Sequence, residues 1–518
     1  MIHMPTLNEA DTQFQEGQLD VAIQIYQEIL AKNPSAVGAI KGLARCAESL
    51  GLTRQAEDAW WQVIKIDPKD LDGLMRKGLS CQRVGQYLNA IKCFSEVISR
   101  SPEPLAAHRA RLQCLLYSDK ASVADREDAQ HALGQFYAAR RAPPRVFAND
   151  RDPNRRLRIG YCSSDFHAHP VGMAMLPLLH FHNREAVEVY SYADVPNQDG
   201  ATEQIKGLCD WWRDIAGMHD DAVAELIVQD EIDILVVLAG HMDRNRLFIG
   251  RTHPAPIQVL HHGQCSSFIS DYDYFIGDSI ITPHGGPEQF SERILRLPCW
   301  TVQAFPAEAK AVKPPPFAGN GYITFGSFNN PIKLNETTLS LWTDIMCNVS
   351  NSRLYLKYYD LYGVPEVRDR IVDFFKAAGI GSERLMFKSD TDARSGHLSH
   401  YGQVDIALDP APFNGATTTF EALLMGVPVI SLLGQQLLAR SAASLITTVG
   451  LPELIGHCPG DYEKIAVSLA TDYERLSAIR RDLRAKIKAS ALFDARRYAR
   501  NMERFYRAMW HVWCDENR

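Results

Sequence analysis

The segment VDIALDPAPFNGATTTFEALLMGVPVISLL, residues 404–433, decides the fold of the C-terminal half of the chain. Its first apolar run, 404–410, predicts a buried strand that ends near Asp409. Three threonines then open a helix that carries Glu421, and a second strand follows at 427–433. Strands that alternate with helices in this way predict a parallel sheet covered on both faces.

Apolar runs of the same kind recur in two series, on either side of a proline-rich stretch at 312–316. The first series is 157–164, 187–194, 232–240, 256–263 and 274–281, and the second is 322–330, 353–360, 384–390, 404–410 and 427–433. Two consecutive doubly wound units place a ligand in the crevice between them, at the carboxyl ends of the strands. Neither first turn carries GxGxxG, which argues against a dinucleotide-dependent oxidoreductase.

The first 105 residues repeat with a period of 34. The residues that keep this interval are Pro34, Pro68 and Pro102; Gly17, Gly51 and Gly85; Ala22, Ala56 and Ala90; Ala10, Ala44 and Gly78; and Tyr26, Trp60 and Phe94. This is the tetratricopeptide pattern, in which small residues let two helices approach and a proline ends the second. Such repeats stack into a solenoid whose concave surface docks a polypeptide, or else they brace the rest of the chain or mediate self-association.

Composition excludes several classes of protein. The 518 residues carry a formal net charge of −7, which argues against a nucleic-acid partner bound through bulk charge. The sequence holds no apolar run of about 20 residues, the length that a membrane-spanning helix needs, and its start lacks the pattern of a signal peptide. Eleven scattered cysteines form no CxxC pair and no zinc-type cluster, which fits reduced thiols. We therefore expect a cytoplasmic protein without a membrane or nucleic-acid partner.

Two candidate anion-binding features follow strands of the second series. Thr417 and Thr418 open the helix after Asn414-Gly415-Ala416, so free N–H groups and hydroxyls suit a phosphate there, although threonines also serve as ordinary N-caps. Lys333 follows the strand at 322–327 together with Asn329 and Asn330. A lysine at that position neutralises a departing phosphate, or is simply solvated.

Three histidines lie at predicted strand ends or beside a predicted strand. His169 follows the first strand of the first series, where it is a candidate general base or substrate anchor. His241 directly follows the strand at 232–240 and is likewise a candidate general base or substrate anchor. His397 precedes the strand at 404–410 and either stacks on a base or fills a packing gap. Each signal is weak alone, but all of these positions face one predicted crevice.

Six blocks in a fixed order carry a family resemblance. They are LRIGYCSSDFHAHP (157–170), HPAPIQVLHHG (253–263), FGSFNNPIK (325–333), HLSHYGQVDIALDPAPFNGATTTFEALLMGVPV (397–429), ARSAAS (439–444) and LFDARRYARNMERFYRAMW (492–510). Together with the repeats they resemble the bacterial relatives of O-linked N-acetylglucosamine transferase. The resemblance implies a GT-B glycosyltransferase that is inverting and metal-independent, and that moves N-acetylglucosamine from a UDP donor to Ser or Thr of a protein docked by the repeats.

The resemblance also implies roles for single residues. Lys333 would meet the diphosphate, with Asn330 beside it; Thr417 and Thr418 would hold phosphate oxygens; Ala416 would border them; Glu421 would bind the ribose; His397 would pack on the uridine; and His169 and His241 would face sugar and acceptor. For the general base, one proposal within the family is a histidine and another is a donor phosphate oxygen.

Three departures from the family pattern leave alternatives open. Ala416 stands where the family often has histidine, Glu421 stands where it often has aspartate, and the loop 263–267 (GQCSS) replaces a Pro-Gly-Thr loop beside the sugar. The alternatives are another UDP-hexose such as glucose, an asparagine-directed or glycan-directed transferase, and an inactive repeat scaffold. Each keeps the same fold.

These observations predict five segments. They are a repeat domain at 1–120, a helical linker at 121–155, a Rossmann-like lobe at 156–316, a UDP-binding Rossmann-like lobe at 317–485, and a C-terminal helix at 486–518 that packs back on the lobes. Amphipathic spacing over 492–510 supports the last of these.

Overall fold

The computed structural model describes residues 6–50, 52–242, 244–389 and 394–517. The chain divides into two compact units, Met1–Leu115 and Leu116–Arg518. We call them the repeat unit and the two-lobed unit and describe each by itself.

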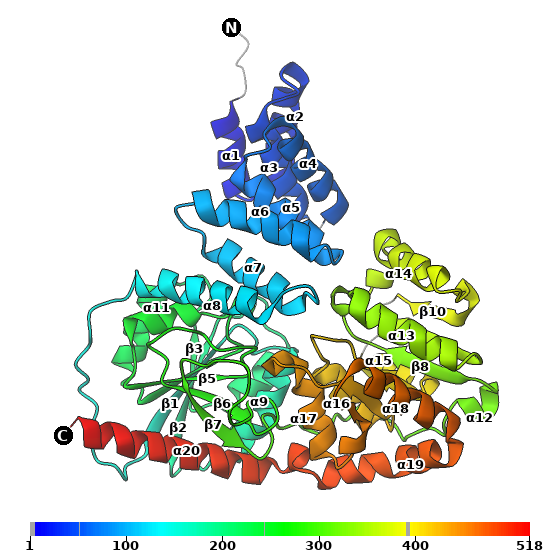
Figure 1. Ribbon diagram of the computed structural model, residues 1–518. Coiled ribbons are helices and arrows are strands. Elements are labelled where there is room, and N and C mark those ends of the chain that lie inside the picture. The colour runs from blue at the N-terminus through cyan, green and yellow to red at the C-terminus, as the bar shows by residue number, and fades with distance from the viewer. Residues whose placement is uncertain (1–5, 51, 243, 390–393, 518) are drawn as a thin grey trace. The chain divides into compact units, whose positions relative to one another are not determined.

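The repeat unit is built of helix pairs, as the period of 34 predicts (Figure 1). The helices are α1 (Leu7–Gln15), α2 (Leu19–Lys32), α3 (Val37–Ser49), α4 (Thr53–Ile66), α5 (Leu71–Arg83) and α6 (Tyr87–Arg100), followed by the start of α7 (Leu105–Tyr117). A Cβ on Gly78 would lie 2.4 Å from the Phe94 ring, which shows why a small residue is needed between paired helices. Gly17 and Gly85 take left-handed φ values of 77° and 79° at the turns, and Gly51 lies outside the described residues.

The N-terminal lobe of the two-lobed unit is a parallel sheet with the strand order β3-β2-β1-β4-β5-β6-β7. Its strands are β1 (Leu157–Ser163), β2 (Val187–Ala193), β3 (Trp211–Asp214), β4 (Ile234–Leu238), β5 (Ile257–His261), β6 (Tyr274–Asp278) and β7 (Arg293–Leu297). The helices between them include α9 (Pro170–Phe181), α10 (Gly200–Lys206) and α11 (Asp220–Gln229). In the register, Ile159 of β1 lies opposite Val189 on one side and Ile234 on the other.

The C-terminal lobe repeats this architecture with the strand order β10-β9-β8-β11-β12-β13. Its strands are β8 (Ile323–Ser327), β9 (Ser352–Lys357), β10 (Leu385–Lys388), β11 (Ile406–Leu408), β12 (Val429–Leu432) and β13 (Ile455–Gly456). Its helices are α12 (Phe317–Asn320), α13 (Glu336–Asn348), α14 (Pro365–Ala377), α15 (Arg394–His400), α16 (Thr417–Leu424), α17 (Ser441–Thr448), α18 (Pro459–Thr471) and α19 (Tyr473–Ala489). The prediction of a repeat solenoid followed by two Rossmann-like lobes is therefore confirmed.

The C-terminal helix α20 (Ala495–Glu516) returns to the N-terminal lobe, where Figure 1 shows it running beneath the strands. Its face with Tyr498, Met502, Tyr506 and Trp510 is buried in the core of that lobe. The Tyr506 hydroxyl lies 2.9 Å from the Tyr161 hydroxyl on β1, so a polar contact inside the core fixes the position of the helix. Since α19 packs on α16 of the C-terminal lobe, the end of the chain contacts both lobes.

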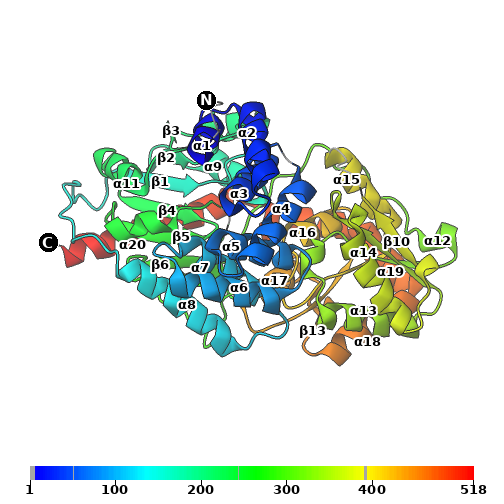
Figure 2. The same cartoon turned by 90° about the horizontal axis from the view of Figure 1, so that it is seen from above.

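The segment at 121–155 is helical only over α8 (Val123–Ala138), and Figure 2 shows this helix alongside the N-terminal lobe. Leu133 and Tyr137 on α8 are buried, and a Cβ on Gly134 would lie 2.2 Å from the carbonyl oxygen of Phe268. The expected linker is therefore in part a packed element of the lobe. The repeat unit ends at Leu115 rather than at 120, because the end of α7 belongs to the second unit.

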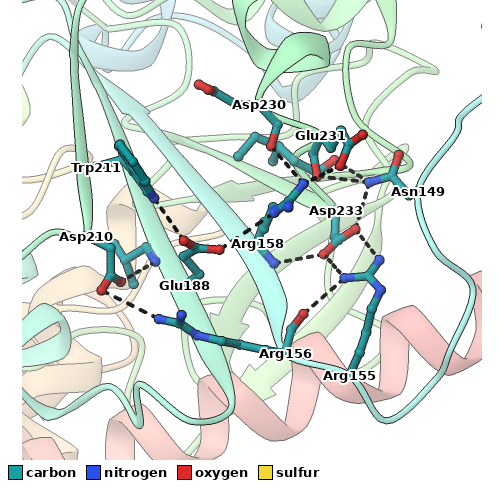
Figure 3. A network of polar contacts seen from close by, with 12 residues as sticks. Asn149, Arg155, Arg156, Arg158, Glu188, Asp210, Trp211, Asp230, Glu231 and Asp233 are labelled. Atoms are coloured by element: carbon teal, nitrogen blue, oxygen red, sulfur yellow. Dashed lines mark hydrogen bonds and ion pairs between the residues drawn. The ribbon is translucent and has the colours of Figure 1, made fainter.

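A polar network at the amino ends of β1 and β4 fastens the segment that enters the N-terminal lobe (Figure 3). Asp233 is fully buried and accepts hydrogen bonds from the guanidinium of Arg155 at 2.6 and 2.7 Å, from the amide of Asn149 at 2.7 Å and from the backbone N–H of Arg158 at 2.8 Å. One carboxylate thus ties the incoming chain to the start of two neighbouring strands.

Within the described ranges, no helix combines the length and the apolar character that crossing a membrane requires.

Candidate functional site

Lys333 lies where β8 ends, in the short 3₁₀ turn Pro331–Lys333 of the C-terminal lobe. Its half-buried Nζ donates to the backbone carbonyl of Asn414 at 2.8 Å and to Oδ1 of Asn329 at 3.2 Å, and it lies 4.4 Å from the centre of the Phe413 ring. Oδ1 of Asn329 also accepts from the Thr418 hydroxyl at 3.0 Å. The carboxyl end of β8 is thereby joined to the first turn of α16.

The electrostatics around Lys333 leave its charge poorly compensated. Burial lowers the pKa of Lys333 to about 8, against the attraction of Asp409, which favours the ammonium. Burial also raises the pKa of Asp409, while hydrogen bonds from the Ser431 hydroxyl at 2.7 Å and the Gly415 N–H at 2.6 Å favour its carboxylate. Since burial disfavours the charged ammonium, an anion that approaches Nζ will stabilise it.

The start of α16 offers further groups for an anion. Ala416 precedes the helix as its N-cap residue and gives it no side-chain cap, so the first N–H groups lack that partner. The hydroxyl oxygen of Thr419 and Oδ1 of Asn414 are buried without a hydrogen-bond partner in the described part of the chain. A Cβ on Gly415 would lie 2.6 Å from Oγ1 of Thr418 and 2.7 Å from Oγ1 of Thr419, so only glycine keeps these hydroxyls in place.

His397 and Glu421 form a second part of the same cluster. Nε2 of His397 lies 3.0 Å from a carboxylate oxygen of Glu421, and its Nδ1 lies 3.4 Å from Nζ of Lys357 at the end of β9. The Tyr401 hydroxyl donates to the backbone carbonyl of Thr418 at 3.1 Å and so joins this part to the start of α16. The ammonium of Lys357, the imidazole of His397 and the carboxylate of Glu421 therefore contact one another in sequence near the start of α16.

The two other predicted histidines belong to the N-terminal lobe. Nδ1 of His169 accepts from the N–H of Val171 at 3.4 Å, which caps α9, and lies 3.7 Å from a carboxylate oxygen of Asp165. His169 keeps 30% of its side chain exposed, so it is accessible to a substrate. His241 is buried, and its Nε2 lies 3.3 Å from the carbonyl oxygen of Ser267. It supports the loop 263–267.

That loop is held by a buried carboxylate that the sequence did not single out. Glu292 accepts from the Ser266 hydroxyl at 2.7 Å and from the Ser267 N–H at 2.8 Å, and it also accepts from the Ser267 hydroxyl. The serines that distinguish this loop are therefore used to fix its backbone.

The structure brings together Lys333, Thr417, Thr418, His397 and Glu421 in the C-terminal lobe, while β1 and β4 place His169 and His241 separately in the other lobe. Asn330 caps the 3₁₀ turn through the N–H of Ile332 at 3.1 Å, so Asn329, rather than its neighbour, contacts Lys333 and Thr418. Lys357 was not predicted. The sequence pattern that could have identified it is a charged residue at the end of strand β9, directly after the apolar run of that strand.

Family models cover most of the chain. The model of glycosyl transferase family 41 matches residues 97–302 and 318–502, and a tetratricopeptide repeat model matches residues 13–77. The first match begins in the last part of the repeat unit and covers most of the two-lobed unit, and the second lies within the repeat unit.

Curated relatives include probable UDP-N-acetylglucosamine–peptide N-acetylglucosaminyltransferases named SPINDLY. The protein of Petunia hybrida is 32% identical over 423 residues, which cover 80% of this chain and 45% of the relative. The protein of Hordeum vulgare is 33% identical over 423 residues, which cover 80% of this chain and 44% of the relative. The chain thus spans less than half the length of these relatives.

A solved structure matches nearly the whole chain. It is an O-GlcNAc transferase of Thermobaculum terrenum in a mutant form with a lysine replaced by methionine, and it superposes with a TM-score of 0.89 at 29% sequence identity. The match covers 99% of this chain and 98% of that one, so repeats and lobes follow each other in the same order in both.

Proposed function

The chain belongs to glycosyl transferase family 41, and from that premise we propose that it transfers N-acetylglucosamine from UDP-N-acetylglucosamine to serine or threonine hydroxyls of a polypeptide. The observation that carries this proposal is the contact of Lys333 with the loop that opens α16, where one ammonium and a helix N-terminus meet. Relatives named for peptide N-acetylglucosaminyl transfer support the choice of donor and acceptor.

In the proposed reaction, the acceptor oxygen attacks the anomeric carbon and the bond from that carbon to the β-phosphate oxygen breaks. UDP leaves with the bonding electron pair, and the configuration at the anomeric carbon inverts. Lys333, Thr417, Thr418 and the N–H groups of α16 stabilise the negative charge that grows on the diphosphate. The acceptor proton passes to His169 or to a phosphate oxygen of the donor.

The remaining part of the cluster is assigned to the nucleoside. Glu421 carries the acceptor oxygens that a ribose hydroxyl needs, and His397 offers a flat ring beside it. We propose that no metal ion is required, because Lys333 and the helix N-terminus already supply positive charge to the leaving group.

We propose that the repeat unit docks the acceptor polypeptide and that the reaction takes place in the cytoplasm. All eleven cysteines of the chain are free thiols, and most of them are buried, which suits a reducing compartment.

The proposal is tested by incubating the full-length protein with UDP-N-acetylglucosamine, UDP-glucose or GDP-mannose, each with EDTA, and with a peptide library rich in serine and threonine. Mass spectrometry then identifies the sugar and the modified side chain. We expect transfer of N-acetylglucosamine to hydroxyl side chains in the presence of EDTA. Transfer of glucose, modification of asparagine, or strict dependence on a divalent cation would each contradict the part of the proposal that it addresses.

Substitution of Gly415 by alanine is expected to weaken UDP binding about tenfold or more, because the new methyl group displaces the hydroxyls of Thr418 and Thr419. Calorimetric titration with UDP measures the effect. Gly319→Ala is the matched control, since a Cβ at Gly319 has no neighbour within 4 Å. Equal affinities of the two variants would show that the diphosphate does not bind at the start of α16.

UDP binding is expected to depend on pH through Lys333. The diphosphate binds the ammonium form, and burial lowers the pKa of Lys333 to about 8. Affinity should therefore change little between pH 7 and 7.5, fall by about tenfold in total as the lysine loses its proton above pH 8, and then level off, with uptake of a proton on binding in that range. Titrations in two buffers of different ionisation enthalpy detect this proton. Lys333→Arg keeps its charge, so its affinity should stay flat over this range; the same fall in that variant would assign the proton to another group.

A further inference from the structure

The chain between α7 and α8 lies against the C-terminal lobe, although in sequence it precedes the N-terminal lobe. Asp119 accepts from the N–H and the hydroxyl of Thr337 at 3.0 and 2.8 Å, at the start of α13. Lys120 forms an ion pair of 3.1 Å with Glu336 in the same turn. Two consecutive residues thus anchor this segment to the lobe that carries Lys333.

Tyr117, at the end of α7, reaches the site itself. Its ring stacks on Phe413 with the ring centres 4.3 Å apart and an interplanar angle of 23°. Phe413 also lies 4.4 Å from Nζ of Lys333, so one aromatic ring contacts both the tyrosine and the lysine. Tyr117 is 7% exposed and so is buried, whereas its partner Phe413 is half-buried.

The loop that carries Phe413 is held on its other side by α13. The amide of Asn335 donates to the carbonyl of Ala411 at 2.8 Å and to that of Tyr117 at 3.4 Å, and the Thr338 hydroxyl donates to the same Ala411 carbonyl at 2.7 Å. Asn335 therefore joins the loop and the end of α7 directly. The hydrogen bonds of Asn335 and Thr338 fix the backbone of the loop, whereas the ring of Phe413 is fixed by Tyr117.

We infer that Tyr117 is a positioning residue for Lys333, acting through Phe413. A lysine side chain has several freely rotating bonds and loses about 2 kcal/mol of conformational free energy when it is ordered. Asn329, the Asn414 carbonyl and the Phe413 ring together define where Nζ stands. Without Tyr117, the ring of Phe413 loses its stacking partner, and water gains access to the ammonium.

This inference rests on the proposed function for its catalytic readout. An ammonium displaced from its position stabilises the charge on the leaving diphosphate less well. We expect Tyr117→Ala to lower kcat by about tenfold to a hundredfold while the KM for the donor changes little, since a misplacement of about 1 Å costs rates of this order. Tyr117→Phe keeps the stack and should behave like the unmodified protein.

The pH dependence of UDP binding gives a readout that a general loss of stability does not move. Among the described residues, the titratable group whose charge acts on Lys333 is Asp409, and burial is the main cause of the lowered pKa of the lysine. In Tyr117→Ala, entry of water should move the midpoint of the affinity loss to higher pH, toward the ordinary lysine value. Leu116→Ala is the control, because it removes a buried side chain from the same helix. Phe413→Leu should reproduce the shift independently.

The outcomes separate the two proposals. If Tyr117→Ala and Phe413→Leu match Leu116→Ala in kcat and in the pH midpoint, Tyr117 does not position Lys333 and the inference is overturned. If Lys333→Met also transfers sugar at the unmodified rate, the proposed role of the lysine has failed, and with it the basis of the inference. The inference is supported if Tyr117→Ala and Phe413→Leu both lower kcat and raise the pH midpoint of UDP binding, while Leu116→Ala changes neither.

Discussion

Replacement of Lys333 by methionine is expected to lower the rate of sugar transfer by about 10³-fold or more, while the protein keeps its fold. The ammonium donates to the Asn414 carbonyl and to Asn329 at the point where the resemblance places the diphosphate. Charge grows on that group as the glycosidic bond breaks, so the loss falls on kcat more than on binding. Methionine has a similar length and still contacts the Phe413 ring, which preserves packing.

The measurement is single-turnover transfer of labelled sugar, together with a thermal melt and a UDP titration of the same preparation. Lys376→Met is the control for the substitution itself, because Lys376 is an exposed lysine on α14 of the same lobe. UDP should still bind Lys333→Met, with an affinity lowered about tenfold, through the N–H groups and hydroxyls of α16. Normal turnover by the variant would show that another group stabilises the leaving diphosphate.

The fold was predictable from the sequence wherever strands are buried on both faces. β4 and β11 are continuous apolar runs, β1 is mostly apolar and almost wholly buried, and each appears within a predicted range. β3 and β7 were missed because they are the edge strands of the N-terminal sheet and expose most of their side chains at least in part. An edge strand needs apolar residues on one face at most, so its sequence resembles that of a loop.

The candidate site was predictable only in its local parts. The small residues and threonines around Gly415 mark a close backbone approach and a helix start, which a sequence shows directly. The choice between Asn329 and Asn330 depends on which side chain caps the turn, and two neighbouring amides in sequence do not reveal it. Tyr117 contacts the site from a segment more than 200 residues away from Lys333 in sequence, and no spacing rule connects the two.

Asp233 is expected to contribute more to stability than any exposed charge of the N-terminal lobe. Its carboxylate is fully buried and accepts from Arg155, Asn149 and the backbone of Arg158 (Figure 3). Substitution by asparagine places an NH₂ group against these donors and leaves Arg155 without its buried counter-charge. We expect the free energy of unfolding to fall by about 3 kcal/mol or more.

Calorimetric melts of the full-length protein measure this loss, and Asp221→Asn is the matched control. Asp221 pairs with Arg251 in the same lobe but exposes 72% of its side chain, so its loss should cost less than about 1 kcal/mol. Asp233 directly precedes β4, at the amino end of the strand, whereas His241 follows the carboxyl end of the same strand. Transfer by Asp233→Asn at a temperature well below its melt should therefore be close to normal. Loss of transfer without loss of stability would mean that the network at the amino ends of the strands influences the opposite edge of the sheet, where the substrate is proposed to bind.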